Sequence, residues 1–112
     1  MNQRTYAGMI WDDAWHRIEA NGHFLNLTPT QYRILRVFTE DITPRLLFSD
    51  TIALLSYRSN SKLEAETGIP RKLLVKHISN INARVLSVRL QLCSFQEGYI
   101  LILSSNSAQK VR

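Results

Sequence analysis

Cations and short polar side chains gather on one side of residues 69–85, the segment IPRKLLVKHISNINARV. On a helical wheel of ~100° per residue, Lys72, Lys76, Ser79 and Ala83 fall within about 40° of one direction, with Asn80 at their edge. The sequence has no Asp or Glu between residues 70 and 88. Ammonium groups attract phosphates, and an amide offers a donor and an acceptor to a base edge. These residue types therefore suit the binding of a polyanion.

Four aliphatic side chains occupy the opposite side of the same wheel: Leu74, Ile78, Ile81 and Val85. A helix with this ridge can anchor itself to a hydrophobic core and leave its polar side free. Many solvated amphipathic helices carry a few lysines, so the spacing alone favours a binding helix and a plain surface helix about equally.

The charge distribution favours the binding helix. The chain has 112 residues, a formal net charge of +5 and a pI near 9.8. Residues 1–56 hold five basic and six acidic residues, whereas residues 57–112 hold nine basic and three acidic ones. A one-sided basic field indicates nucleic acid first and an anionic membrane second. A basic protein without such a partner is the competing interpretation.

Other chemistry finds little support in the sequence. His16, His23 and His77 lack metal-ligand spacing, and no carboxylate or thiol cluster joins them. We interpret His77 as a partly buried structural residue and Cys93, the single cysteine, as an inert strand residue. No glycine-rich phosphate loop is present. We therefore expect neither an enzyme nor a metal or cofactor.

Size and hydropathy predict one compact domain over residues 1–112 that is soluble and cytoplasmic. The N-terminus has no signal-peptide core, and the longest apolar run, YILIL, is far shorter than a membrane span. One cysteine permits no internal disulfide, which suits a reducing compartment. Residues 104–112 are polar, and we expect a frayed tail there.

The first third of the chain predicts antiparallel strands. Asn21-Gly22 is a strong hairpin signal, because a type I′ turn needs positive φ at both positions. We expect one strand from Trp15, a return strand through Phe24, and a further strand at residues 9–11. The two Trp residues, Trp11 and Trp15, could mark a ligand site, but covering one face of this sheet is the better interpretation.

Three helices should follow. Thr28, Pro29 and Gln31 form an N-cap, a first-turn proline and a capping box, so a helix begins there and ends near residues 39–41. Residues 47–59 predict a second helix, capped by Ser49 or Asp50 and burying its side chains Ile52, Leu54 and Leu55. Residues 62–67 suit a short helical turn that stops at Gly68. The third helix covers about residues 70–86.

Alternating side chains after residue 88, followed by a Gly98 loop and the run YILIL, predict a β-hairpin over about residues 88–103. The order of strands, three helices and a hairpin fits an α+β winged helix-turn-helix with N-terminal antiparallel strands, a three-helix core and a C-terminal wing.

These segments resemble the winged-helix DNA-binding (effector) domain of OmpR-type response regulators over about residues 10–103. IEANGHFLNLTPTQYRIL is similar to the family's strand, turn and first-helix start, with Gln31 where Glu is usual. KLLVKHISNINARV is similar to the recognition helix, and EGYIL to the end of the wing. The family's receiver domain has no counterpart here, so we expect a stand-alone effector or a piece of a longer protein.

The resemblance implies a sequence-specific, double-stranded DNA-binding transcription regulator. It implies that the third helix enters the major groove and that the hairpin touches the minor groove or the backbone. The residues expected to face bases or phosphates are Lys72, Val75, Lys76, Ser79, Asn80 and Asn82, together with Arg71 and Arg84. RNA polymerase or another transcription protein, and a second copy on DNA, are candidate further partners, and the location would be the cytoplasmic nucleoid.

The sequence departs from the family at the wing. Where the family usually has Thr-Val-Arg-Gly-x-Gly-Tyr-Arg, CSFQEGYI lacks both arginines, and Asn82 stands where a second Arg is usual. These departures keep a second hypothesis open, a winged-helix protein–protein interaction module with weak or no DNA binding, in which Leu73 or Ile100 would be exposed. RNA binding is supported by net charge alone.

Overall fold

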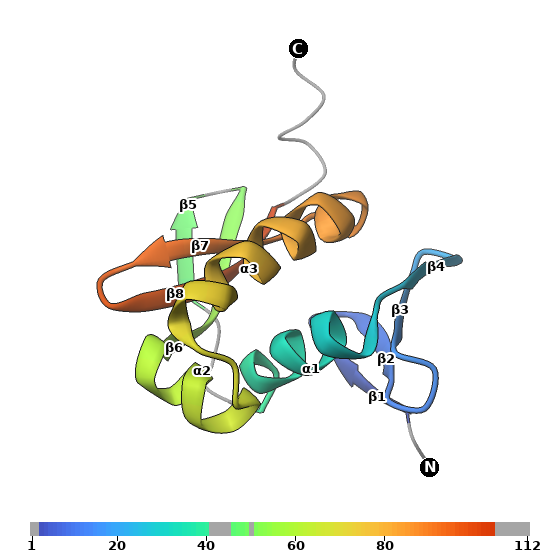
Figure 1. Ribbon diagram of the computed structural model, residues 1–112. Coiled ribbons are helices and arrows are strands. Elements are labelled where there is room, and N and C mark those ends of the chain that lie inside the picture. The colour runs from blue at the N-terminus through green and yellow to red at the C-terminus, as the bar shows by residue number, and fades with distance from the viewer. Residues whose placement is uncertain (1–2, 41–45, 50, 105–112) are drawn as a thin grey trace.

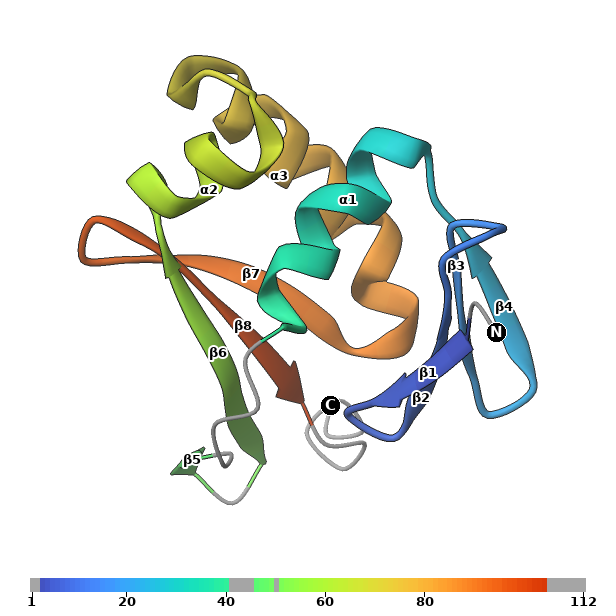
Figure 2. The same ribbon diagram turned by 90° about the horizontal axis from the view of Figure 1, so that it is seen from below.

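The computed structural model describes residues 3–40, 46–49 and 51–104, which form two antiparallel sheets and three α-helices (Figure 1). Helix α1 lies between the two sheets (Figure 2). The expected α+β winged helix-turn-helix architecture is confirmed. The elements along the chain are β1 (Gln3–Tyr6), β2 (Met9–Asp12), β3 (Arg17–Ala20), β4 (His23–Asn26), α1 (Pro29–Phe38), β5 (Leu46–Ser49), β6 (Ile52–Ser59), α2 (Asn60–Thr67), α3 (Arg71–Val85), the 3₁₀ turn η1 (Leu86–Val88), β7 (Leu90–Phe95) and β8 (Gly98–Ser104).

The N-terminal sheet has the strand order β1-β2-β3-β4. The hairpin prediction is confirmed, since Asn21 and Gly22 have φ of 52° and 82° between β3 and β4. Strand β1 was not predicted. Strand β3 begins at Arg17 rather than at Trp15, because the chain is still turning at His16, whose φ is 53°. Trp11 is fully buried beneath the sheet.

Helix α1 begins as its sequence predicts. The Thr28 hydroxyl accepts a hydrogen bond from the Gln31 backbone N–H (3.1 Å), and the Gln31 side chain accepts one from the Thr28 N–H (3.1 Å). Pro29 fills the first helical position. The helix ends at Phe38, and the face formed by Ile34, Leu35 and Phe38 is completely buried.

The predicted second helix over residues 47–59 is wrong: the described part of this segment forms β5 and β6. Strand β6 pairs with β8, and the pairing shifts register at Leu55, which is buried. The Ser56 hydroxyl donates to the Phe38 carbonyl (2.8 Å). A short apolar run fits either a helix or a strand, and here long-range pairing decides. Ile52 and Leu54 are only partly buried, and Asp50 lies outside the described residues.

The C-terminal sheet has the order β5-β6-β8-β7, so β8 is a central strand. The predicted hairpin is confirmed as β7 and β8, although Val88 belongs to η1 rather than to a strand. Ile100, expected to be exposed, is 5% exposed. The backbones approach closely at Gly98, where a Cβ would stand 2.2 Å from the Arg58 carbonyl oxygen.

Helix α2 is longer than the predicted turn, because Ser59 caps it by accepting from the Lys62 N–H (3.1 Å). It ends as predicted at Gly68, whose φ is 73°. The expected frayed tail lies outside the described residues except for Ser104, which ends β8. Within the described part of the chain, no helix is long and apolar enough to cross a membrane.

Candidate nucleic-acid interface

Helices α2 and α3 form a helix-turn-helix with a three-residue turn, Gly68 to Pro70. Gly68 reverses the chain in the left-handed region, and its N–H donates to the Glu64 carbonyl (2.8 Å). The Thr67 hydroxyl donates to the Leu63 carbonyl (2.7 Å) and accepts from the Ile69 N–H (3.1 Å). These bonds occupy the polar groups at the end of α2 and fix the direction in which α3 leaves it.

The aliphatic ridge of α3 is buried as its spacing predicts. Leu74, Ile81 and Val85 have no exposed surface and Ile78 has 4%. The ridge joins the core formed by α1, the N-terminal sheet and β7. Burial of these four side chains sets the rotation of the helix, so the opposite side must face outward.

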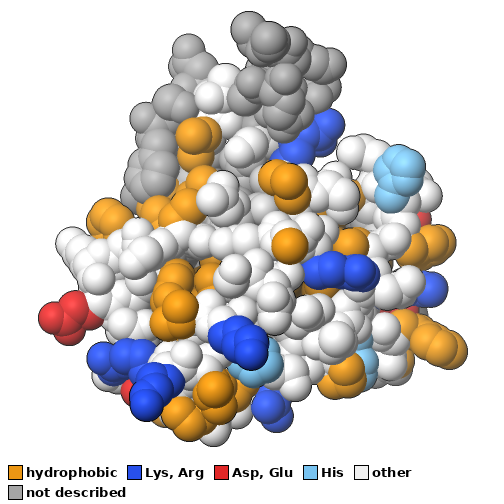
Figure 3. Space-filling model, turned by 45° about the horizontal axis from the view of Figure 1, so that its top comes forward, with side chains coloured by type: hydrophobic (Ala, Val, Ile, Leu, Met, Phe, Trp, Pro, Cys, Tyr) orange, Lys and Arg blue, Asp and Glu red, His pale blue; other side chains and the backbone are white. Residues whose placement is uncertain are grey.

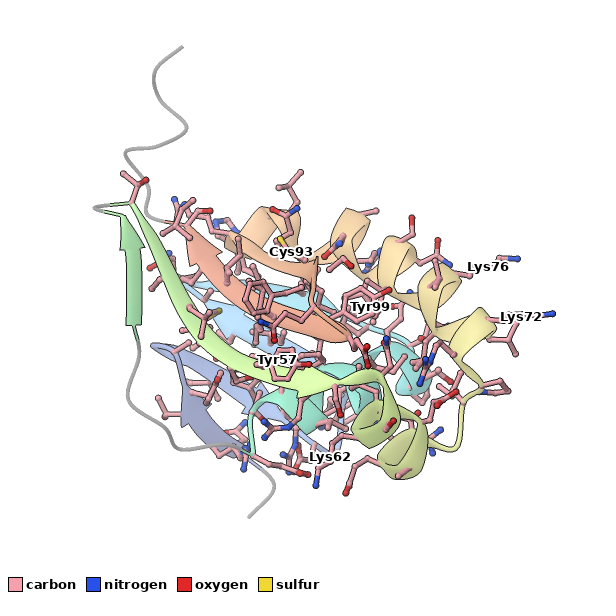
Figure 4. The ribbon with its side chains drawn as sticks, turned by 90° about the vertical axis from the view of Figure 1, so that its left-hand side faces the viewer. Tyr57, Lys62, Lys72, Lys76, Cys93 and Tyr99 are labelled. Carbon is pink, nitrogen blue, oxygen red and sulfur yellow. The ribbon has the colours of Figure 1, made fainter. Side chains whose placement is uncertain are left out.

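The outward face of α3 carries five of the predicted contact residues. Lys72, Val75, Lys76, Ser79 and Asn80 are all exposed. Figure 4 shows Lys72 and Lys76 extending from one side of α3, away from the body of the molecule. On the face of the molecule where α3 lies, basic side chains are spaced along the lower part and acidic ones show mainly at the edges (Figure 3).

Arg71 lies at the start of α3 and is paired with the carboxylate of Glu64. The Glu64 carboxylate accepts a hydrogen bond from the Arg71 backbone N–H (2.8 Å) and contacts its guanidinium (3.3 Å). Pro70, the residue at the cap position, makes no side-chain cap. Glu64 therefore caps α3 from the preceding helix, next to the positive end of the helix dipole. The sequence did not predict this contact, because Glu64 belongs to α2 and lies outside the acid-free stretch of α3.

Asn82 does not lie where the sequence placed it. Its side-chain amide donates to the Leu92 carbonyl (2.9 Å) and accepts from the Leu92 N–H (2.8 Å). Both polar groups of the amide are thus engaged by the edge of β7, and the side chain is half-buried. We correct the prediction accordingly: Asn82 joins the helix to the wing and is not presented to a base edge.

Arg84 lies near the end of α3 and is exposed, and its guanidinium donates to the Asn26 carbonyl at the end of β4. This bond ties the C-terminal half of α3 to the N-terminal sheet. The two arginines among the predicted contact residues thus both have partners within the protein: Arg84 a backbone carbonyl, and Arg71 a carboxylate. Lys72 and Lys76 both extend away from the body of the molecule (Figure 4).

The wing differs from α3 in charge. Between residues 90 and 104 the sequence contains Glu97 and no Lys or Arg. Phe95 is 42% exposed beside the turn and packs edge-on against Tyr57, with ring centroids 6.1 Å apart. The Glu97 carbonyl accepts from the Asn60 N–H (2.8 Å), which fastens the wing turn to the start of α2. The wing is therefore held to the helices but brings no cation.

His77 and Cys93, the other side chains with possible reactivity, are both half-buried. His77 is half-buried on α3, beside the aliphatic ridge. Cys93 is half-buried on β7, and this burial raises the pKa of its thiol. Among the described residues, no three His, Cys, Asp or Glu side chains are grouped so that they could hold a metal ion.

Comparison with solved structures identifies the fold. The chain is similar to the DNA-binding domain of response regulator AdeR, in a crystal structure in complex with an intercistronic region. The TM-score is 0.61 at 18% sequence identity, and the match covers 91% of this chain and 99% of that one. The chain has the fold of a response-regulator DNA-binding domain. No family model and no curated protein sequence matches it.

Proposed function

We propose that the chain is a sequence-specific, double-stranded DNA-binding transcription regulator, with α3 in the major groove and the β7–β8 hairpin as the wing. One observation carries the proposal: the outward face of α3 presents Lys72 and Lys76 beside Val75, Ser79 and Asn80. The major groove admits a helix, and small or medium side chains allow close approach to base edges. We further propose that residues 1–112 act as a single unit.

The proposed roles differ among the contact residues. Lys72 and Lys76 neutralise phosphates and so set affinity and its dependence on salt. Asn80 can make paired hydrogen bonds to adenine, and Val75 can pack on a thymine methyl group, so these two residues would set sequence preference. The solved neighbour of the same fold is a DNA-binding domain in complex with an intercistronic region, which supports DNA as the partner.

The test is a binding titration against a random-sequence duplex pool, with sequencing of the retained DNA. The retained sites are then titrated at several salt concentrations with the native chain and with Lys72→Ala and Lys76→Ala. Each lysine change should make the slope of log K against log salt shallower by about one. The matched control is Arg17→Gln, which removes a cation from the N-terminal sheet instead of from α3. This change should leave the slope unchanged. An unchanged slope in both lysine variants would refute the proposal.

A second candidate function is a winged-helix protein–protein interaction module with weak or no DNA binding. The absence of Lys and Arg from residues 90–104 favours it, because a wing without cations gains little from phosphates. Retention of no duplex from the random pool would favour this module over the regulator.

A further inference from the structure

The ion pair between Arg71 and Glu64 lies at the end of α3 from which Lys72 projects. Arg71 and Lys72 are the first two residues of α3, and Lys72 extends away from the body of the molecule (Figure 4). Glu64 belongs to α2, whereas α3 itself contains no Asp or Glu. Glu64 therefore brings a negative charge from the preceding helix to the basic start of α3.

The two carboxylate oxygens of Glu64 have different partners. Oε2 accepts a hydrogen bond from the Arg71 backbone N–H at 2.8 Å, and Oε1 accepts one from the Arg71 guanidinium at 3.3 Å. Capping a backbone N–H requires an acceptor oxygen, which a neutral amide side chain also offers. The negative charge of Glu64 is therefore dispensable for the cap and acts on the guanidinium.

The ion pair is long and open to solvent. The side chains of Arg71 and Glu64 are 55% and 37% exposed. Only one terminal nitrogen of the guanidinium contacts Glu64, and no described residue accepts a hydrogen bond from its other two nitrogens. An exposed ion pair contributes little to stability. Arg71 can therefore exchange the carboxylate for a phosphate while α2 and α3 stay in place.

Glu64 sets Arg71 apart from the two lysines of α3. Among the described residues, no acid pairs with Lys72 or Lys76. A cation that neutralises a DNA phosphate raises affinity and makes it depend more steeply on salt. A carboxylate beside the cation opposes both effects, because it competes for the guanidinium and repels the phosphate.

We propose that Glu64 limits the affinity of the chain for duplex DNA by competing with a phosphate for Arg71. In the free chain the guanidinium is paired with Glu64; on DNA it turns to a phosphate, and Glu64 keeps the backbone N–H. This inference rests on the proposed function and deepens it, because it adds a residue of α2 that sets affinity. A phosphate contact carries no sequence information, so the limit applies to duplexes of any sequence.

The test compares Glu64→Gln with the native chain by fluorescence polarisation on two labelled duplexes, a site retained from the random pool and a scrambled duplex of the same composition. Glutamine keeps an oxygen for the cap and removes the charge, so the variant should melt near the native temperature. It should bind both duplexes about three- to tenfold more tightly, and the slope of log K against log salt should be steeper by about one.

The matched control is Glu66→Gln. Glu66 also lies on α2, is 39% exposed and pairs with Lys62 at 3.3 Å, but it lines a groove beside α1. This change removes the same charge and should alter affinity by less than about twofold, because salt screens a charge that does not face the DNA. In an Arg71→Gln background, the gain from Glu64→Gln should fall by at least half on a logarithmic scale.

Equal gains for Glu64→Gln and Glu66→Gln would overturn the inference, as would weaker binding by Glu64→Gln. A gain confined to the retained site would also overturn it, because Arg71 would then read a base. If the native chain binds duplex DNA and Glu64→Gln binds it no better, the inference fails and the proposed function stands. If neither chain binds any duplex, both fail.

Discussion

Replacing Asn82 by Ala should destabilise the fold and loosen the wing, because this side chain joins α3 to β7 through two hydrogen bonds of 2.9 and 2.8 Å. A net hydrogen bond in a protein stabilises by about 0.5–1.5 kcal/mol. The two bonds together therefore predict a loss of about 1–3 kcal/mol in the free energy of unfolding. For a domain of this size, such a loss lowers the melting temperature by roughly 5–15 °C.

The measurement is urea unfolding followed by fluorescence, with the buried Trp11 as reporter. Asn80→Ala is the matched control, since Asn80 is an exposed residue of the same helix and the change brings the same gain in helix propensity. Its unfolding free energy should stay within about 0.5 kcal/mol of the native value, apart from that gain. Equal stability of the two variants would refute the reasoning.

DNA binding separates the two roles that Asn82 could have. If the amide acts through the wing, Asn82→Ala loses stability without DNA present, and Asn80→Ala loses DNA affinity without losing stability. Asn82→Asp sharpens the comparison, because a carboxylate can still accept from the Leu92 N–H but repels the Leu92 carbonyl. We expect this variant to be at least as unstable as Asn82→Ala at neutral pH. If the Asn82→Asp protein is stable but no longer binds DNA, Asn82 contacts DNA and the role given to it here is wrong.

Gly98→Ala should destabilise by about 1–3 kcal/mol in urea unfolding, because its Cβ would meet the Arg58 carbonyl oxygen at 2.2 Å; native stability would show that β6 and β8 can separate at no cost. Thr28→Ala removes the N-cap of α1 and should cost about 1 kcal/mol by the same assay; a loss below about 0.3 kcal/mol would mean that the capping box is not formed in solution. Hydrogen bonds from Arg36 hold the pKa of Asp13 below its usual value, so the stabilisation is complete above the unfolded-state pKa and is lost as the pH falls through the lowered folded-state value. Asp13→Asn should therefore be less stable than the native chain at pH 7, and the difference should shrink below about pH 4; a pH-independent difference would contradict this sign.

The parts of the fold that local chemistry determines were predictable. The capping box of Thr28 and Gln31 marks the start of α1 by the residues that make its hydrogen bonds. The ridge of α3 repeats often enough that its buried face was unambiguous. The Asn21-Gly22 turn needs positive φ, and few other residue pairs adopt it readily.

The parts that depend on distant partners were not predictable. Residues 52–59 become a strand because β8 pairs with them, and β8 begins only at Gly98, 39 residues after β6 ends at Ser59. The Glu64 cap on α3 and the Asn82 contact with β7 join separate elements, so neither leaves a periodic signal. Asn82 was expected to face DNA because it matches a position of the family's recognition helix, and nothing in the sequence indicated that β7 lies beside it.

The central place of β8 has a consequence for how the protein is made. Strand β8 is hydrogen-bonded on both sides, to β6 and to β7, and it is the last of the described elements to be synthesised. Until it leaves the ribosome, β6 and β7 both lack the strand that joins them. The C-terminal sheet should therefore stay unassembled on the nascent chain. A force profile measured with translation-arrest peptides should show the folding force of this sheet only after residue 104 has emerged.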